Sequence, residues 1–68
     1  MENYNKKPEC KLIGEDGNIF NLLSIAVCTL RKHGLRDQAE ELNHRIWQGE
    51  ATSYHHAIQI IMEYVEVI

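Results

Sequence analysis

The fold is decided by residues 19–33, which read IFNLLSIAVCTLRKH. Apolar side chains recur there every three or four positions, and at about 100° per residue they share one wide face of a helix. That face consists of Ile19, Phe20, Leu22, Leu23, Ala26, Val27 and Leu30. Asn18 can cap the first turn, and Gly34 is a typical terminating residue, with Leu35 placed to fold back onto the last turn. The pattern therefore predicts a helix over this stretch.

Two further helical patterns follow. Residues 35–48 carry a narrow apolar stripe, and Gly49 marks its end. The stripe consists of Leu35, Ala39, Leu42 and Ile46. Residues 53–66 repeat apolar side chains at helical spacing after Thr52 and Ser53, either of which can cap a helix. Because short loops place neighbouring helices antiparallel, the sequence predicts a mainly α fold, a small three-helix domain.

The two ends of the chain give further expectations. Residues 1–9 are hydrophilic and predict a flexible N-terminus, followed by a single helical domain over residues 10–68. Residues 10–13, CKLI, predict a short N-terminal extended segment. The last residues, 65–68, also alternate partly like a strand. An alternative fold therefore pairs them with residues 10–13 instead of continuing the third helix.

A turn precedes the first helix at residues 14–18, GEDGN. Asp16-Gly17 is typical of a tight turn, and we expect a positive φ at Gly17. A phosphate-binding loop would need a lysine after its second glycine, and a calcium loop would need a ladder of acids. Neither pattern is present, so the segment is interpreted as a structural turn.

Composition bounds the class of protein. The chain has 68 residues, 44% of them hydrophobic and 25% charged, which suffices for one small domain. Its formal net charge of −3 argues against a general polyanion binder, whose domain is usually basic. No apolar run approaches the roughly 20 residues that span a bilayer, and the first residues do not begin a signal peptide. Two cysteines, Cys10 and Cys28, are too few for a disulfide framework, so we expect free thiols in a reducing cytoplasm.

The sequence offers no recognisable catalytic or metal-binding spacing. Cys28 and His33 are five positions apart, which matches no zinc-ligand pair. The adjacent His55 and His56 would point about 100° apart on a helix and could not chelate one ion together. A chain this short also struggles to enclose a pocket of the size that small molecules need. We therefore expect no enzymatic activity, no metal and no cofactor.

Some apolar residues are left over once each helix is given one buried face. They are Ile25, Cys28, Trp47, Ile60 and Val67. A monomer of this size has few places to bury them, whereas association supplies the missing burial, and tryptophan is enriched at interfaces. The sequence therefore predicts a protein–protein interaction module that associates with itself, as a homodimer, or with a protein partner.

Two other functions stay open. Basic residues near the junction of the first two helices could bind nucleic acid, with Arg31, Lys32, Arg36 and Arg45 as candidate phosphate ligands. Several acidic side chains on the second helix would repel phosphate, and basic residues also suit the C-terminal end of a helix. The second alternative is an accessory subunit of a larger complex.

The segment GEDGNIFNL at residues 14–22 resembles the opening of a group of small bacterial proteins, some of them phage-associated. The shared pattern continues through Ala26, Leu30, Gly34, Ser53, Tyr54, Ala57 and residues 64–67. The resemblance covers residues 11–68 and implies a complete small protein. No function is attached to the group, so the resemblance implies no activity and transfers no catalytic or binding residue.

Overall fold

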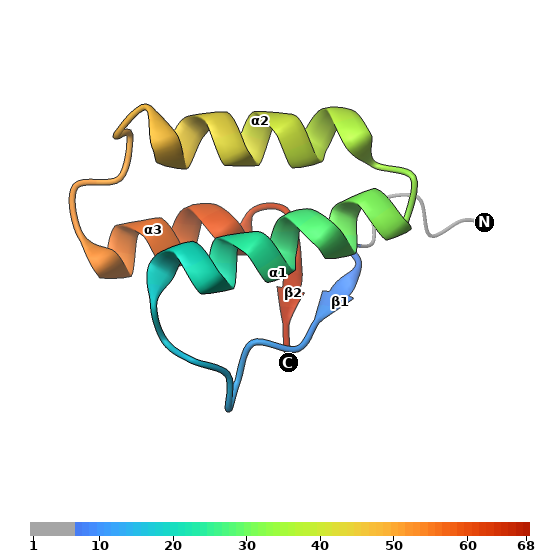
Figure 1. Cartoon of the computed structure of the whole chain (residues 1–68), viewed down its shortest axis with the longest axis horizontal. Helices are drawn as coiled ribbons and strands as arrows, with labels where there is room; N and C mark the ends of the chain where they lie inside the picture. The colour runs from blue at the N-terminus through green and yellow to red at the C-terminus, as the bar shows by residue number, and fades with distance from the viewer. Residues whose placement is uncertain (1–6) are drawn as a thin grey trace.

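The computed structural model describes residues 7–68 as three helices and one pair of short strands (Figure 1). In chain order these are β1 (Glu9–Cys10), α1 (Ile19–Lys32), α2 (Arg36–Trp47), α3 (Tyr54–Met62) and β2 (Glu66–Val67). α1 and α2 lie side by side and run antiparallel, α3 packs behind α1, and the strands lie below the helices. The predicted mainly α, three-helix class is confirmed.

Local signals fix both ends of α1. Asn18 Oδ1 accepts a hydrogen bond from the backbone N–H of Phe20 at 2.9 Å, which is the predicted cap. At the other end Gly34 adopts a φ of 75°, a conformation that is easy only for a residue without Cβ. The N–H of Leu35 can then donate to the carbonyl of Leu30 at 2.9 Å. α1 matches the predicted range to within one residue.

The same kinds of local signal end α2 and begin α3. Gly49 follows α2 with a φ of 86°, and the N–H of Glu50 donates to the carbonyl of Arg45 at 3.1 Å. Ser53 Oγ accepts from the N–H of His56 at 3.1 Å and so caps α3. α2 is one residue shorter than predicted at each end.

The prediction that the third helix continues to residue 66 is wrong. α3 ends at Met62, and the chain then turns so that Val65 is fully buried and β2 follows. β2 pairs in parallel with β1, as in the alternative fold, and the N–H of Ile68 donates to the carbonyl of Cys10 at 2.9 Å. The β-branched tail leaves the helix because β1 supplies backbone hydrogen bonds to an extended chain.

The strand pair also moves the N-terminal boundary of the domain. Residues 1–6 of the predicted flexible N-terminus lie outside the described residues. The carbonyl of Pro8 accepts from the N–H of Glu66 at 2.9 Å, and Glu9 lies opposite Glu66 in the sheet register. The strand pairing therefore includes Pro8 and Glu9, which precede the predicted start of the helical domain at residue 10.

The turn before α1 differs from the prediction in its backbone. The positive φ occurs at Gly14, at 93°, and not at Gly17. Asp16 Oδ1 accepts from the N–H of Asn18 at 3.0 Å, so a side chain makes the bend without a left-handed residue at this point. The carbonyl of Gly17 accepts a hydrogen bond from Tyr54 Oη at 2.5 Å, which ties the turn to α3.

One apolar core joins the helices to the strand pair. Its largest fully buried side chains are Leu30, Leu42, Ile60, Ile61, Val65 and Cys10. Because Ile60 is only 1% exposed, the predicted surplus stripe on the third helix is wrong. Val67 lies in β2 opposite Cys10 and packs half-buried against the same core. The strand pair thus provides cover that three helices alone would lack.

Replacing Ile60 tests this assignment. Ile60→Ala should lower the free energy of unfolding by about 2–5 kcal/mol, the usual cost of emptying a buried aliphatic site. The loss should be equal at low and high protein concentration, because Ile60 lies in the monomer core. Denaturant titration followed by circular dichroism measures it, and the control Met62→Ala, at an exposed position of α3, should cost less than about 1 kcal/mol. A loss that grows on dilution would place Ile60 at an interface instead.

Candidate interaction surface

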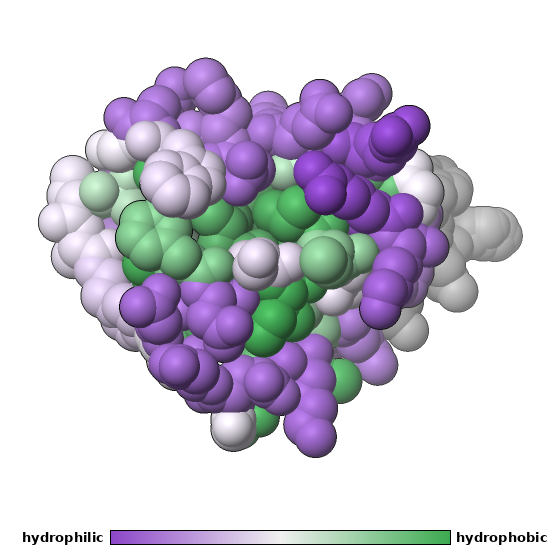
Figure 2. Space-filling model, viewed as in Figure 1, coloured by the Kyte–Doolittle hydropathy of each residue, from purple (hydrophilic) through white to green (hydrophobic). Residues whose placement is uncertain are grey.

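The solvent-facing side of α1 carries apolar side chains among polar ones. Figure 2 shows a band of hydrophobic surface on this side of the molecule, bordered above and below by hydrophilic side chains. We name this band, with the adjoining tryptophan of α2, the α1 surface. Its members are Phe20, Leu23, Ser24, Ile25, Val27, Cys28, Arg31 and Trp47. Exposed apolar side chains gathered beside grooves are typical of an interaction site.

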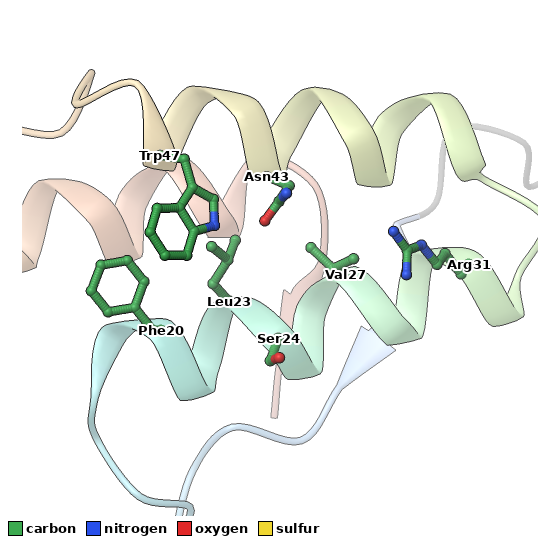
Figure 3. A pocket seen from close by; sticks show the side chains of 7 residues that line it. All are labelled: Phe20, Leu23, Ser24, Val27, Arg31, Asn43 and Trp47. Atoms are coloured by element: carbon green, nitrogen blue, oxygen red, sulfur yellow. The ribbon is translucent and has the colours of Figure 1, made fainter.

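A groove with a volume of about 220 Å³ runs between α1 and α2 (Figure 3). Leu23 and Val27, both nearly buried, form its floor. At one end Phe20 and Trp47 stack with their ring centroids 4.7 Å apart, yet their side chains stay 49% and 64% exposed. Arg31 lines the opposite end. The groove therefore has an apolar floor, an aromatic end and a cationic end.

A second groove, of about 300 Å³, lies beside the first along α1. It is lined by Ser24, Ile25, Cys28, Thr29 and Lys32. Thr29 Oγ1 donates to the carbonyl of Ile25 at 2.9 Å, so its hydroxyl is satisfied within the helix. Both grooves share Ser24, which lies one turn from Cys28. The ridge between the grooves therefore carries small side chains.

The structure separates the predicted interface residues into two sets. Ile25, Cys28 and Trp47 lie together on the α1 surface. Ile60 belongs to the core, and Val67 packs against it from β2. The α1 surface therefore includes the predicted residues of the first two helices. It does not include Ile60 and Val67, which were predicted on the third helix.

Sequence reasoning missed the residues at the two ends of the α1–α2 groove, Phe20 and Arg31, as contact residues. It assigned Phe20 to the buried face, because the apolar arc of α1 is wider than the side that packs on the core. The width of that arc was itself the available signal, since a helix packed on one side leaves the edge of a wide arc exposed. Arg31 was considered as a phosphate ligand or as a residue that suits the C-terminal end of a helix, whereas the structure places it in the α1–α2 groove.

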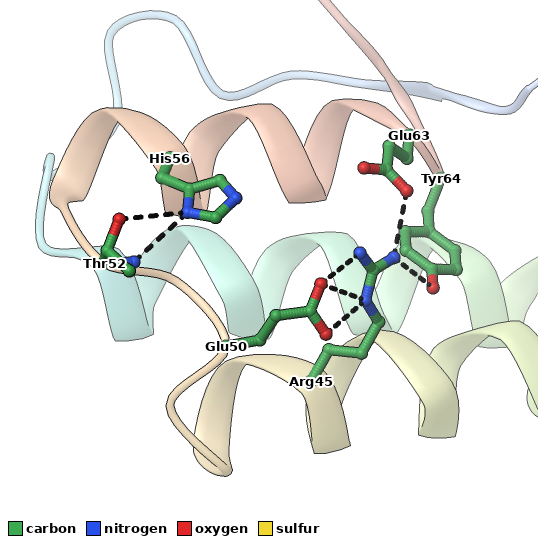
Figure 4. Close-up of polar contacts among 6 residues, drawn as sticks. All are labelled: Arg45, Glu50, Thr52, His56, Glu63 and Tyr64. Carbon is green, nitrogen blue, oxygen red and sulfur yellow. Dashed lines mark hydrogen bonds and ion pairs between the residues drawn. The ribbon is translucent and has the colours of Figure 1, made fainter.

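A separate polar cluster joins α2 to the end of α3 around Arg45 (Figure 4). Arg45 Nη2 lies 2.5 Å from Glu50 Oε2, and Nη1 lies 2.9 Å from Glu63 Oε1. Nη1 also donates to Tyr64 Oη at 2.9 Å. One guanidinium thus connects the loop after α2 with the residues where α3 ends, and it helps to hold the turn into the tail.

These contacts change the charge equilibria of the cluster. The hydrogen bond from Arg45 lowers the pKa of Glu50, and hydrogen bonds to Glu50, Glu63 and Tyr64 raise the pKa of Arg45. Burial raises the pKa of Tyr64, although its hydrogen bond with Arg45 acts in the opposite direction. Arg45 is engaged within the fold, so the four cations proposed for nucleic acid do not form one site.

The other three candidate phosphate ligands lie around the junction of α1 and α2. Arg31, Lys32 and Arg36 are all exposed there. Arg31 and Lys32 line the two grooves of the α1 surface, while Asp37 lies beside Arg36 in a separate hollow. Two of the three cations are therefore positioned to contact whatever binds the α1 surface.

The remaining chemistry can be stated for residues 7–68. No three His, Cys, Asp or Glu side chains of this range gather closely enough to hold a metal ion. Cys10 is buried and Cys28 is exposed, and both are free thiols. Within the same range, no helix combines the length and apolar character needed to cross a bilayer.

Comparisons with protein families, with curated proteins and with solved structures find no match for this chain. What the α1 surface does must therefore follow from its shape, its apolar area and the charges at its ends.

The lowered pKa of Glu50 makes stability sensitive to acid. Its contribution is present above the unfolded-state pKa near 4.5 and is lost as the pH falls through the lower folded-state value. Glu50→Gln should therefore lower the melting temperature at neutral pH. It should also make the melting temperature fall less steeply as the pH is lowered from about 5 to about 3. Glu40→Gln, at an exposed position of α2, is the matched control and should keep the wild-type slope. Equal slopes for Glu50→Gln and wild type would show that Glu50 is not stabilised in the fold.

Proposed function

We propose that the protein is a non-enzymatic interaction module that forms a homodimer in the cytoplasm, with the α1 surface as its interface. The observation that carries this proposal is the stacked pair of Phe20 and Trp47, which stays about half exposed at one end of the α1–α2 groove. Apolar area left in water costs roughly 25 cal/mol per Å², and tryptophan at a groove is typical of interface hot spots. Burial against another chain removes that cost.

A second copy suits this surface because the surface offers both halves of a contact. Phe20 and Trp47 present aromatic rings at one end, and rings attract cations. Arg31 and Lys32 present cations at the other end. The small ridge and the grooves beside it also suit the packing of helix ridges into helix grooves. In a twofold dimer each such contact occurs twice.

Two features support a role without catalysis and a reducing location. The hollows among the described residues, of about 220 to 360 Å³, lie near or below the lower end of the roughly 300–1,000 Å³ of small-molecule sites. The lining of the two grooves mixes apolar side chains with Ser24, Asn43 and Thr29 and with the cations at the end of α1. The exposed free thiol of Cys28 suits a compartment that keeps cysteines reduced, which favours the cytoplasm.

Cys28→Glu tests the proposed interface directly. The substitution places a carboxylate near the middle of the α1 surface, so a twofold dimer would bring two like charges into an apolar contact. The variant should be monomeric at concentrations where wild type is a dimer, with unchanged helical circular dichroism. Analytical ultracentrifugation measures the mass. Gln59→Glu, on the exposed side of α3, adds the same charge elsewhere and should leave the dimer intact.

Two outcomes would overturn the proposal. A wild type that stays monomeric at millimolar concentration would exclude self-association. If that monomer were also retained on DNA with a steep salt dependence, nucleic-acid binding would replace the proposal. If Cys28→Glu and Gln59→Glu dimerise equally, the interface lies outside the α1 surface.

A further inference from the structure

The geometry points to an antiparallel arrangement of α1 against α1 of a second copy, in which Arg31 of each copy lies on the Phe20–Trp47 pair of the other. The inference rests on the proposed self-association, and it adds the register and the contact that selects it. Its starting point is the polarity of the α1–α2 groove, which is aromatic at one end and cationic at the other.

The two ends of the groove belong to one side of α1. Phe20 and Arg31 are separated by three turns and differ by only about 20° around the helix axis. At 1.5 Å per residue, their backbone positions are about 16 Å apart along the axis. Figure 3 shows the aromatic rings and the guanidinium at opposite ends of the groove, with Leu23 and Val27 between them.

A twofold axis exchanges these ends when it crosses α1 midway between them, at right angles to the helix. Phe20 of one copy then faces Arg31 of the other, and Ser24 faces Val27. Leu23, in the groove floor, faces Cys28, on the ridge beside the second groove. The small Ser24 of one copy thus meets the apolar Val27 of the other near the twofold axis, which suits the packing of closely approaching helices.

The chemistry of the end contact favours this direction over the parallel one. A guanidinium attracts the negative face of an aromatic ring, most strongly that of tryptophan, and the attraction grows when water is excluded. The antiparallel arrangement forms two such contacts per dimer, each between Arg31 and the partner's aromatic pair. A parallel arrangement would place Arg31 of one copy against Arg31 of the other, and the two positive charges would repel. Arg31 therefore acts as the residue that fixes the direction of pairing.

Two single variants and their mixture test the register. Arg31→Glu removes the cation, and Phe20→Arg places a guanidinium where the ring was, so each variant alone should dimerise at least about tenfold more weakly than wild type. In an equimolar mixture, the introduced carboxylate at position 31 faces the introduced guanidinium at position 20, while the other end keeps its native contact. The mixture should therefore form a heterodimer with an affinity close to that of wild type, measured by sedimentation with one variant fluorescently labelled.

The controls distinguish a failure of the antiparallel register from a failure of self-association itself. Arg36→Glu makes the same charge change at the start of α2 and should dimerise like wild type, and circular dichroism verifies that each variant is folded. If wild type dimerises but Arg31→Glu dimerises as tightly or more tightly, the antiparallel contact is wrong and self-association stands. If the mixture of variants dimerises no more tightly than each variant alone, the register is wrong. If wild type is monomeric, both claims fall.

Discussion

The structure depends on one constraint: α1 carries apolar side chains in two directions, and the packing of residues 7–68 covers only one of them. Leu22, Ala26 and Leu30 are buried against the other helices and β1. Phe20 and Cys28 face solvent on the same helix. Within residues 7–68 no second layer covers them, and small chains bury a smaller fraction of their surface than large ones. A second chain on the outer side of α1 would bury both side chains.

The strand pair explains why Ile60 of α3 belongs to the core and not to an exposed surface. The tail folds back beside β1, so Val65 joins the core that also encloses Ile60. Arg45 strengthens this closure, since its contacts with Glu50, Glu63 and Tyr64 surround the point where α3 turns into the tail. Apolar side chains such as Ile13 are exposed elsewhere, but they do not line the grooves of the α1 surface.

The sequence predicted the features that depend on neighbours in the chain. The caps at Asn18 and Ser53 and the stop at Gly34 are local, and the helices begin and end where these residues place them. The tail depends on a partner more than fifty residues away, so its own pattern left helix and strand open. The exposure of Phe20 depends in the same way on how much of the apolar arc α2 and α3 cover, which a helical wheel does not contain. Ile25, Cys28 and Trp47 were predicted as interface residues because they fall outside every buried stripe of the helical wheels.

The most direct measurement of the central claim is the fluorescence of Trp47, the single tryptophan of the chain, as protein concentration is raised. Its side chain is 64% exposed in the monomer and lies on the α1 surface. We predict that the emission maximum moves to shorter wavelength as the dimer forms, in parallel with the mass measured by light scattering. An emission that keeps the wavelength of a water-exposed indole while the mass doubles would place the interface elsewhere, and a mass that never rises would contradict self-association itself.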